Sequence, residues 1–96
     1  MKTIEIDVEK VIAETIEMYD YEYKTKKDII CHLIQSGVDV NSKQFIDYNK
    51  SAEESYRLFE LSKLALEEKY VNNIPNRVGW NLIYNTCKLE VLVDED

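Results

Sequence analysis

The sequence predicts an α+β fold in which a long antiparallel two-helix hairpin is followed by a small antiparallel β-hairpin. Two long stretches carry apolar residues at an alternating spacing of four and three, the pattern of a helix with one buried face. From Val78 onward the apolar period changes to two, which is typical of strands. A chain of 96 residues has room for one core, so we predict a single domain over residues 1–96.

The first helix is predicted over residues 8–36. Its apolar face keeps the four-three spacing at seven successive positions: Ile12, Ile16, Tyr19, Tyr23, Lys26, Ile30 and Leu33. Asp7 is placed to cap the start of this helix, and Gly37 can adopt the left-handed conformation that ends one. The alternation within residues 19–23 would also suit a strand, but the helical spacing runs through this segment without a turn residue.

The second helix is predicted over residues 42–71, with Asn41 or Ser42 as its N-cap. Its apolar face has the same spacing: Phe45, Asn49, Ala52, Tyr56, Phe59, Lys63, Leu66 and Tyr70. The helix should end before Pro75, because proline disfavours helix in the residue that precedes it. The connector at residues 37–41 is short, so the two helices should run antiparallel, with Tyr23 near Tyr56.

A β-hairpin is predicted from residues 78–84 and 87–93, with a two-residue turn between them or a longer loop. The expected register pairs four positions: Tyr84 with Cys87, Leu82 with Leu89, Trp80 with Val91 and Val78 with Val93. Every large apolar side chain except Ile83 and Leu92 then lies on one face. An isolated hairpin is marginally stable in water, so residues 2–6, which also alternate, are a candidate third strand.

Charge and composition argue against two classes of function, nucleic-acid binding and membrane association. The chain has 12 Lys or Arg against 19 Asp or Glu, a net charge of −7. Such a chain is poorly suited to neutralise phosphates, so we predict no direct nucleic-acid binding. No apolar run is long enough to span a bilayer, and the N-terminal residues lack the basic and apolar blocks of a signal peptide. We therefore predict a cytoplasmic protein that does not bind membranes.

The residues that most often carry chemistry form no recognisable constellation. Cys31 and His32 are adjacent, so on a helix they point about 100° apart, and Cys87 is distant in the sequence. We interpret both cysteines as small buried hydrophobic residues and His32 as an exposed helical residue. The sequence therefore predicts a protein that is not an enzyme and that holds no metal or cofactor.

Candidate interface residues are the apolar and aromatic side chains that lie off the predicted buried faces: Tyr21, Ile46, Leu61, Ile83 and Leu92. Tyrosine is enriched at interfaces, and this chain has seven. Because two long helices and a small sheet make a thin core, a homodimer is one expected outcome. Lys26 and Lys63 occupy positions on the apolar helix faces, where they either fix the register of the helices or face a groove that binds an acidic group.

The C-terminal half resembles a known family. Its aromatic-rich helix is followed by residues 80–91, with the sequence WNLIYNTCKLEV. This segment is similar to the C-terminal part of the small accessory proteins of CXXX-repeat peptide modification systems, which carry a Trp-x-hydrophobic-x-aromatic-x-Thr-Cys-x-hydrophobic pattern. Such proteins are encoded with cysteine-rich precursor peptides and radical-type maturation enzymes in bacterial peptide natural-product pathways. The resemblance implies a role in binding and transfers no catalytic residue.

Three function classes follow. The first is a non-catalytic accessory protein that binds a protein or peptide in a bacterial cytoplasm, as in a ribosomal peptide modification pathway. The second is a small acidic inhibitor, immunity protein or nucleic-acid mimic that blocks a basic site. The third is a self-associating structural module. Strongly salt-sensitive binding would favour the mimic, whereas salt-tolerant binding that Tyr21→Ala abolishes would favour an aromatic interface.

Overall fold

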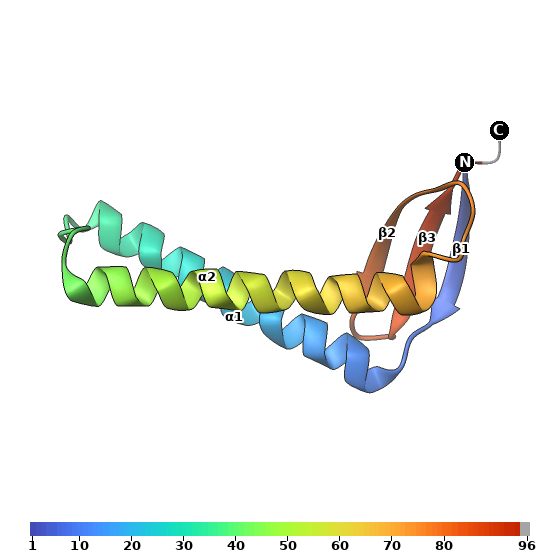
Figure 1. Cartoon of the computed structure of the whole chain (residues 1–96), viewed down its shortest axis with the longest axis horizontal. Helices are drawn as coiled ribbons and strands as arrows, with labels where there is room; N and C mark the ends of the chain where they lie inside the picture. Colours follow the sequence, from blue (N-terminus) through green and yellow to red (C-terminus); the bar gives the residue numbers. More distant parts are fainter. Residues whose placement is uncertain (95–96) are drawn as a thin grey trace. The chain divides into compact units, whose positions relative to one another are not determined.

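The protein has two helices and a three-stranded antiparallel sheet, so the predicted α+β fold class is confirmed (Figure 1). The computed structural model describes residues 1–94. In chain order its elements are β1 (Lys2–Asp7), α1 (Lys10–Gln35), α2 (Lys43–Leu66), a π-helix (Glu67–Val71), β2 (Arg77–Ile83) and β3 (Lys88–Val93).

The chain divides into two compact units. The sheet unit comprises residues 1–17 and the chain from Ser62 onward, and the hairpin unit comprises residues 18–61. The strands therefore belong to the sheet unit, and the connector between the helices belongs to the hairpin unit. A single domain over residues 1–96 stays a prediction.

The candidate third strand is present as β1, and the sheet has the order β1-β3-β2, with β3 in the middle (Figure 1). Both neighbours run antiparallel to β3, and β1 places Ile4 opposite Val91. Beyond the strand, the Val8 amide donates a hydrogen bond to the Cys87 carbonyl at 2.9 Å. The third strand supplies backbone pairing and apolar burial that an isolated, marginally stable hairpin lacks.

Because β1 extends to Asp7, the predicted helix cap at this residue is wrong. Asp7 is the last strand residue and pairs with Lys88. The helix α1 starts two residues later than expected, at Lys10, and the Glu9 carbonyl accepts the hydrogen bond from the Ala13 amide at 3.1 Å. The sheet register therefore decides where the helix begins.

The predicted hairpin register is confirmed in its central part, where Leu82 pairs with Leu89 and Trp80 pairs with Val91. The expected pairing of Val78 with Val93 is wrong, because an irregularity between residues 77 and 79 shifts the register and moves Arg77 opposite Val93. An extra residue of this kind is typical of an exposed sheet edge, where it interrupts the row of free backbone groups.

The turn of the β-hairpin spans residues 84–87 and so is the longer loop rather than a two-residue turn at 85–86. The Cys87 amide donates to the Tyr84 carbonyl at 3.3 Å, which closes the turn. Cys87 has a φ of 54°, in the left-handed region that non-glycine residues seldom adopt. The expected pair of Tyr84 with Cys87 is thus part of the turn and not of the ladder.

Most of the buried apolar side chains lie in the sheet unit: Val8, Ala13, Ile16, Leu66, Val71, Leu82, Leu89 and Val91. Leu89 and Val91 are 0% exposed, because alternate residues of the middle strand point to the same face. Full burial of a side chain of this size contributes roughly 1.5–3 kcal/mol relative to exposure. This cluster is the hydrophobic core.

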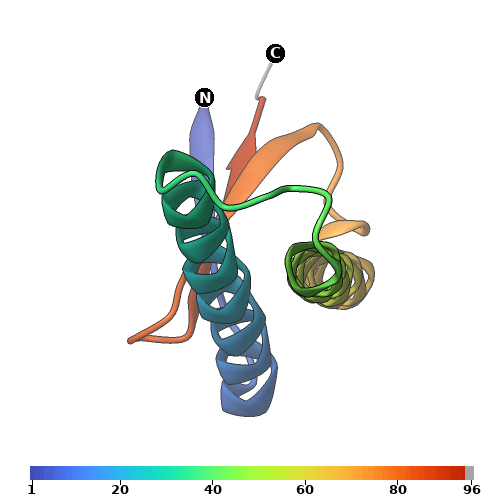
Figure 2. The same ribbon diagram turned by 90° about the vertical axis from the view of Figure 1, so that its left-hand side faces the viewer.

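In the hairpin unit, the end of α1 and the start of α2 have the predicted caps. Gly37 has a φ of 83°, and the Val38 amide donates to the Leu33 carbonyl at 3.1 Å, which is the hydrogen bond of a Schellman motif. Ser42 Oγ accepts a hydrogen bond from the Phe45 amide at 3.3 Å at the start of α2. Figure 2 shows the connector between these caps.

Apart from the later start of α1, the two helices follow the predicted ranges, and the one difference is the geometry of the last turn of the second helix. Residues 19–23 are helical, so the alternative of a strand there is wrong. The second helix reaches residue 71 as expected, but its last turn is a π-helix in which the Asn72 amide donates to the Glu67 carbonyl at 2.8 Å. One π-helical turn hardly changes the spacing of the apolar residues, so the sequence pattern does not predict it.

Candidate functional site

The helices of the hairpin unit contact each other through Tyr23 and Tyr56, as predicted. Their ring centroids are 4.9 Å apart and the ring planes are tilted by 50°. Tilted aromatic pairs contribute about 0.5–1.5 kcal/mol beyond the burial of their surface. Tyr56 is 45% exposed, so this contact lies at the surface of the helix pair.

Lys26 makes a second contact between these helices. Its Nζ donates hydrogen bonds to Ser51 Oγ at 2.8 Å and to Ser55 Oγ at 2.9 Å. Ser55 is only 3% exposed, and a buried hydroxyl is costly unless it is hydrogen-bonded. These contacts favour the interpretation that Lys26 fixes helix register. The role of Lys63, which is half-buried, stays a prediction.

Next to the tyrosine pair, a groove of about 250 Å³ lies between the two helices. Four residues of α1 and four of α2 line it: Tyr23, Lys27, Ile30, Cys31, Asn49, Ala52, Glu53 and Tyr56. The lining is largely apolar, with a cation on one helix, Lys27, and a carboxylate on the other, Glu53. A groove of this volume is smaller than typical drug-sized ligand pockets of about 300–1,000 Å³ and has room for one or two side chains.

Two exposed isoleucines extend the groove toward the connector. Ile34 follows Ile30 by four residues and Ile46 precedes Asn49 by three, so each shares a helix face with a lining residue. Ile34 is 51% exposed and Ile46 is 41% exposed. We define the groove face as the eight lining residues together with these two isoleucines.

The five predicted interface residues are distributed over both units. Tyr21, Ile46 and Leu61 are exposed in the hairpin unit, whereas Ile83 is half-buried and Leu92 exposed in the sheet unit. Of the five, only Ile46 belongs to the groove face. The interface residues were predicted off the apolar helix faces, whereas most of the groove lining lies on those faces: Tyr23, Ile30, Asn49, Ala52 and Tyr56. The signal in the sequence was therefore the pair of apolar faces itself, with Lys27 and Glu53 next to it.

Polar and charged residues occupy much of the sheet face opposite the core. Glu5 stands opposite Glu90 in the register, a like-charge pair that disfavours this pairing. Lys88 binds Asp7, and the pKa of Lys88 is raised mainly by the hydrogen bond to that carboxylate and also by its charge. Such a face is typical of a solvated surface.

The π-helix contacts β2 and Glu9, the residue before α1, within the sheet unit. Trp80 Nε1 donates to Glu67 Oε1 at 2.9 Å, and the Glu9 amide donates to the Tyr70 hydroxyl at 3.2 Å. Lys69 Nζ lies 2.6 Å from Glu9 Oε1, and the hydrogen bond to Glu9 is the main reason why the pKa of Lys69 is raised. The wide turn therefore positions successive side chains for structural contacts.

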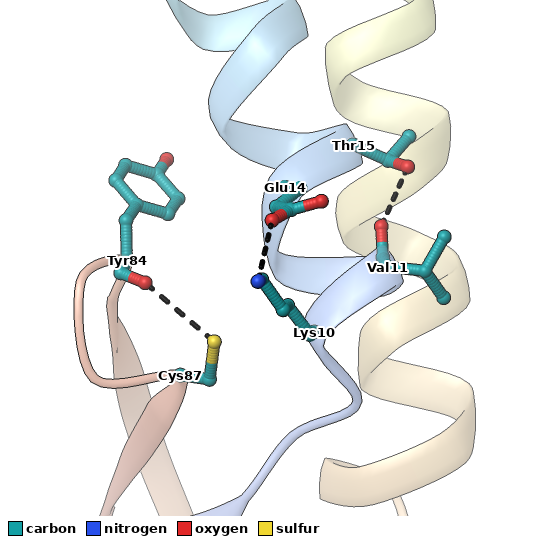
Figure 3. A network of polar contacts seen from close by, with 6 residues as sticks. All are labelled: Lys10, Val11, Glu14, Thr15, Tyr84 and Cys87. Atoms are coloured by element: carbon teal, nitrogen blue, oxygen red, sulfur yellow. Dashed lines mark hydrogen bonds and ion pairs between the residues drawn. The ribbon is translucent and has the colours of Figure 1, made fainter.

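The predicted burial of the cysteines is wrong. Both are free, with Cys31 exposed beside the groove and Cys87 half-buried in the turn of the β-hairpin. Figure 3 shows the Cys87 thiol directed at the Tyr84 carbonyl, 3.7 Å away. The prediction rested on the general preference of cysteine for buried positions, and Cys31 is not one of the positions in the apolar spacing of the first helix. His32 is exposed, as predicted.

A second apolar groove, of about 210 Å³, lies in the sheet unit. It is lined by residues of α1 and α2: Val11, Ile12, Thr15, Ile16, Ser62 and Ala65. The Thr15 hydroxyl donates to the Val11 carbonyl at 2.7 Å within the helix (Figure 3). No charged residue lines this groove, so it cannot select a partner by charge.

Two further observations concern the part of the chain that the structure describes. Within residues 1–94, no three or more His, Cys, Asp or Glu residues are grouped so that they could hold a metal ion. Neither helix there combines the length and apolarity needed to cross a membrane. No protein-family model, curated protein or solved structure matches this chain. The resemblance of residues 80–91 to peptide-modification accessory proteins accordingly stays a prediction.

Proposed function

We propose that this chain is a non-catalytic protein-interaction module that binds a protein or peptide through its hairpin unit in a bacterial cytoplasm. One observation carries this proposal: large apolar side chains remain exposed along the hairpin unit. They are Met18, Tyr21, Ile29, Ile34, Val38, Val40, Ile46, Tyr56 and Leu61. Three of them, Ile34, Ile46 and Tyr56, lie on the groove face, and exposed apolar patches are typical of protein contact sites.

The groove face supplies the most specific part of this surface. Its volume of about 250 Å³ suits the insertion of an apolar or aromatic side chain from a partner. Lys27 and Glu53 on the two walls would orient that partner by its charges. The resemblance of residues 80–91 leads us to propose a cysteine-rich precursor peptide, or the enzyme that modifies it, as the cellular partner.

An inhibitor or nucleic-acid mimic would need its acidic groups gathered on one surface. In the hairpin unit, carboxylates are instead interleaved with cations, as in the ion pairs of Asp20 with Lys24 and of Glu54 with Arg57. Exposed pairs of this kind contribute little to stability, and they neutralise much of the local field. The interleaving supports the apolar interaction surface over the mimic.

The test is affinity capture from the source cells with the full chain immobilised. Binding is measured at about 0.1 M and about 1 M salt, where the screening length falls from about 10 Å to about 3 Å. We expect a partner that is retained at both salts and lost with Ile30→Asp. Gln44→Glu, which introduces the same charge at an exposed position of α2 that does not line the groove, is the matched control and should retain it.

Two outcomes would overturn the proposal. One is capture of a basic nucleic-acid-handling protein at low salt alone, which would favour the acidic inhibitor. The other is a partner that binds equally well to the wild type and to Ile30→Asp, because the hairpin groove would then have no part in binding.

A further inference from the structure

We infer that the groove face binds a second copy of this chain, so that two hairpin units pack face to face as a four-helix bundle. This inference rests on the proposed function, because it concerns the same surface, for which a second copy and the cellular partner would compete. It follows from three features of the hairpin unit: its few buried side chains, its unpaired charges and its exposed isoleucines.

The hairpin unit has few buried side chains of its own. Of residues 18–61, all of which are described, only Phe45, Ala52 and Ser55 are buried. Ordering the backbone costs about 1–2 kcal/mol per residue, which so small a buried set does not offset. Helix pairs commonly gain a core when the apolar faces of two pairs pack together. We therefore expect the groove face to pack against another apolar surface.

The charges on the groove walls are free to pair with another molecule. Lys27 forms no ion pair with any residue in the range 1–94. Glu53 accepts only a long hydrogen bond, at 3.4 Å, from Asn49 Nδ2 among the described residues. A cation on the α1 wall and a carboxylate on the α2 wall make the groove face complementary to itself.

A two-fold dimer brings the same surface of both copies together, so its symmetry axis decides which charges meet. An axis parallel to the helices stacks α1 of one copy on α2 of the other, and Lys27 then meets Glu53 twice. An axis perpendicular to the helices stacks α1 on α1, and Lys27 then meets Lys27. Juxtaposed like charges cost several kcal/mol, so the charges select the parallel axis.

The same axis brings the exposed isoleucines together. Ile34 of one copy then lies over the end of α2 that carries Ile46 of the other, and both side chains are removed from water. Each chain carries a net charge of −7, which opposes association at low salt. Apolar contact must therefore supply most of the affinity, and added salt should preserve or strengthen the dimer.

Sedimentation equilibrium of the purified full chain tests the inference with four samples: the wild type, Lys27→Glu, Glu53→Lys and an equimolar mixture of the two variants. We expect a wild-type dimer, with a dissociation constant that rises about tenfold or more in each single variant, because two attractive contacts become repulsive. In the mixture, the carboxylate introduced at position 27 of one variant faces the ammonium group introduced at position 53 of the other. Heterodimers should therefore form with nearly wild-type affinity.

Asp47→Lys is the matched control for Glu53→Lys, because Asp47 is an exposed carboxylate on the side of α2 away from the groove, and its reversal should leave the dissociation constant nearly unchanged. Helical content by circular dichroism verifies that each variant is folded. A wild type that stays monomeric would overturn the inference, and so would a dimer that the single reversals do not weaken. Either result leaves the capture experiment above to decide the proposed function independently.

Discussion

The ammonium nitrogen of Lys26 lies 2.9 Å from the hydroxyl oxygen of Ser55, which is the one buried polar side chain among the described residues. A lysine on an apolar helix face would be expected to weaken the pairing of the helices. Here it satisfies a hydroxyl on the facing helix, so only one register of the two helices provides this contact. The contact between Lys26 and Ser55 therefore contributes more to the alignment of the two helices than to the free energy of unfolding.

This pair leads to a first prediction. Lys26→Met alone should lower the free energy of unfolding by about 1–3 kcal/mol, because the Ser55 hydroxyl stays buried without its donor. The double variant Lys26→Met/Ser55→Ala should recover most of that loss, since both polar groups are then replaced. Urea unfolding at one fixed protein concentration measures both. A double variant as unstable as Lys26→Met would contradict the structural role.

A second prediction concerns the helix end at Gly37. Gly37→Ala should cost about 1 kcal/mol, because a φ of 83° strains any residue with a Cβ atom. A Cβ atom at Gly37 would meet nothing within 4 Å, so the cost is conformational and not steric. Gly79→Ala is the matched control, since it also meets nothing within 4 Å and needs no left-handed backbone. Equal effects of the two substitutions in thermal unfolding would refute the cap.

A third prediction uses Trp80, the one tryptophan of the chain. Glu67→Ala removes the acceptor for the indole N–H and should cost about 1 kcal/mol, with a shift of the fluorescence emission of the folded protein. Glu68→Ala changes an exposed neighbour in the same π-helix and should do neither. If both variants gave the same emission and stability, Glu67 would have no part in positioning Trp80.

A fourth prediction is the pH dependence of the Lys88–Asp7 pair. The pKa of Lys88 is raised above its ordinary value of 10.5, so the folded state holds this proton more tightly than the unfolded state. The stabilisation by the pair is therefore complete below about pH 10 and is lost as the pH rises through the folded-state pKa. The difference in unfolding free energy between wild type and Lys88→Met should shrink over that range.

Urea titrations at low salt, in steps from neutral to alkaline pH, measure this difference. Both side chains are exposed, so the effect should be small and should fall further when salt is added. A difference that grows as the pH rises would contradict the direction of the Lys88 shift.

The main elements of the fold could be predicted because each depends on a local apolar period. The spacing of Tyr23 and Tyr56 on their helices, combined with a short connector, was enough to place the two rings together. Alternation, combined with a turn centred on residues 85–86, predicted the pairing of Leu82 with Leu89. Both patterns are visible in the sequence because one face of each element is buried, and burial decides which residue types are tolerated on that face.

Other features depend on contacts that periodicity does not encode. The pairing of Asp7 with Lys88 extends β1 and delays the start of α1, and the irregularity before Gly79 changes the register at the start of β2. The groove between Lys27 and Glu53 results from two helices together, so the spacing within either one does not reveal it. The five predicted interface residues were sought off the apolar helix faces, whereas most of the groove lining lies on them, so only Ile46 belongs to the groove face.

Hydrogen–deuterium exchange of the full chain, followed over a range of protein concentrations, tests most directly whether residues 18–61 form an interaction surface that needs a partner. We predict that amides in this hairpin unit exchange faster as the protein is diluted, because its few buried side chains stabilise it poorly alone. Amides of β3, where Leu89 and Val91 are fully buried, should be insensitive to dilution. Concentration-independent exchange throughout residues 18–61 would contradict self-association through the groove face.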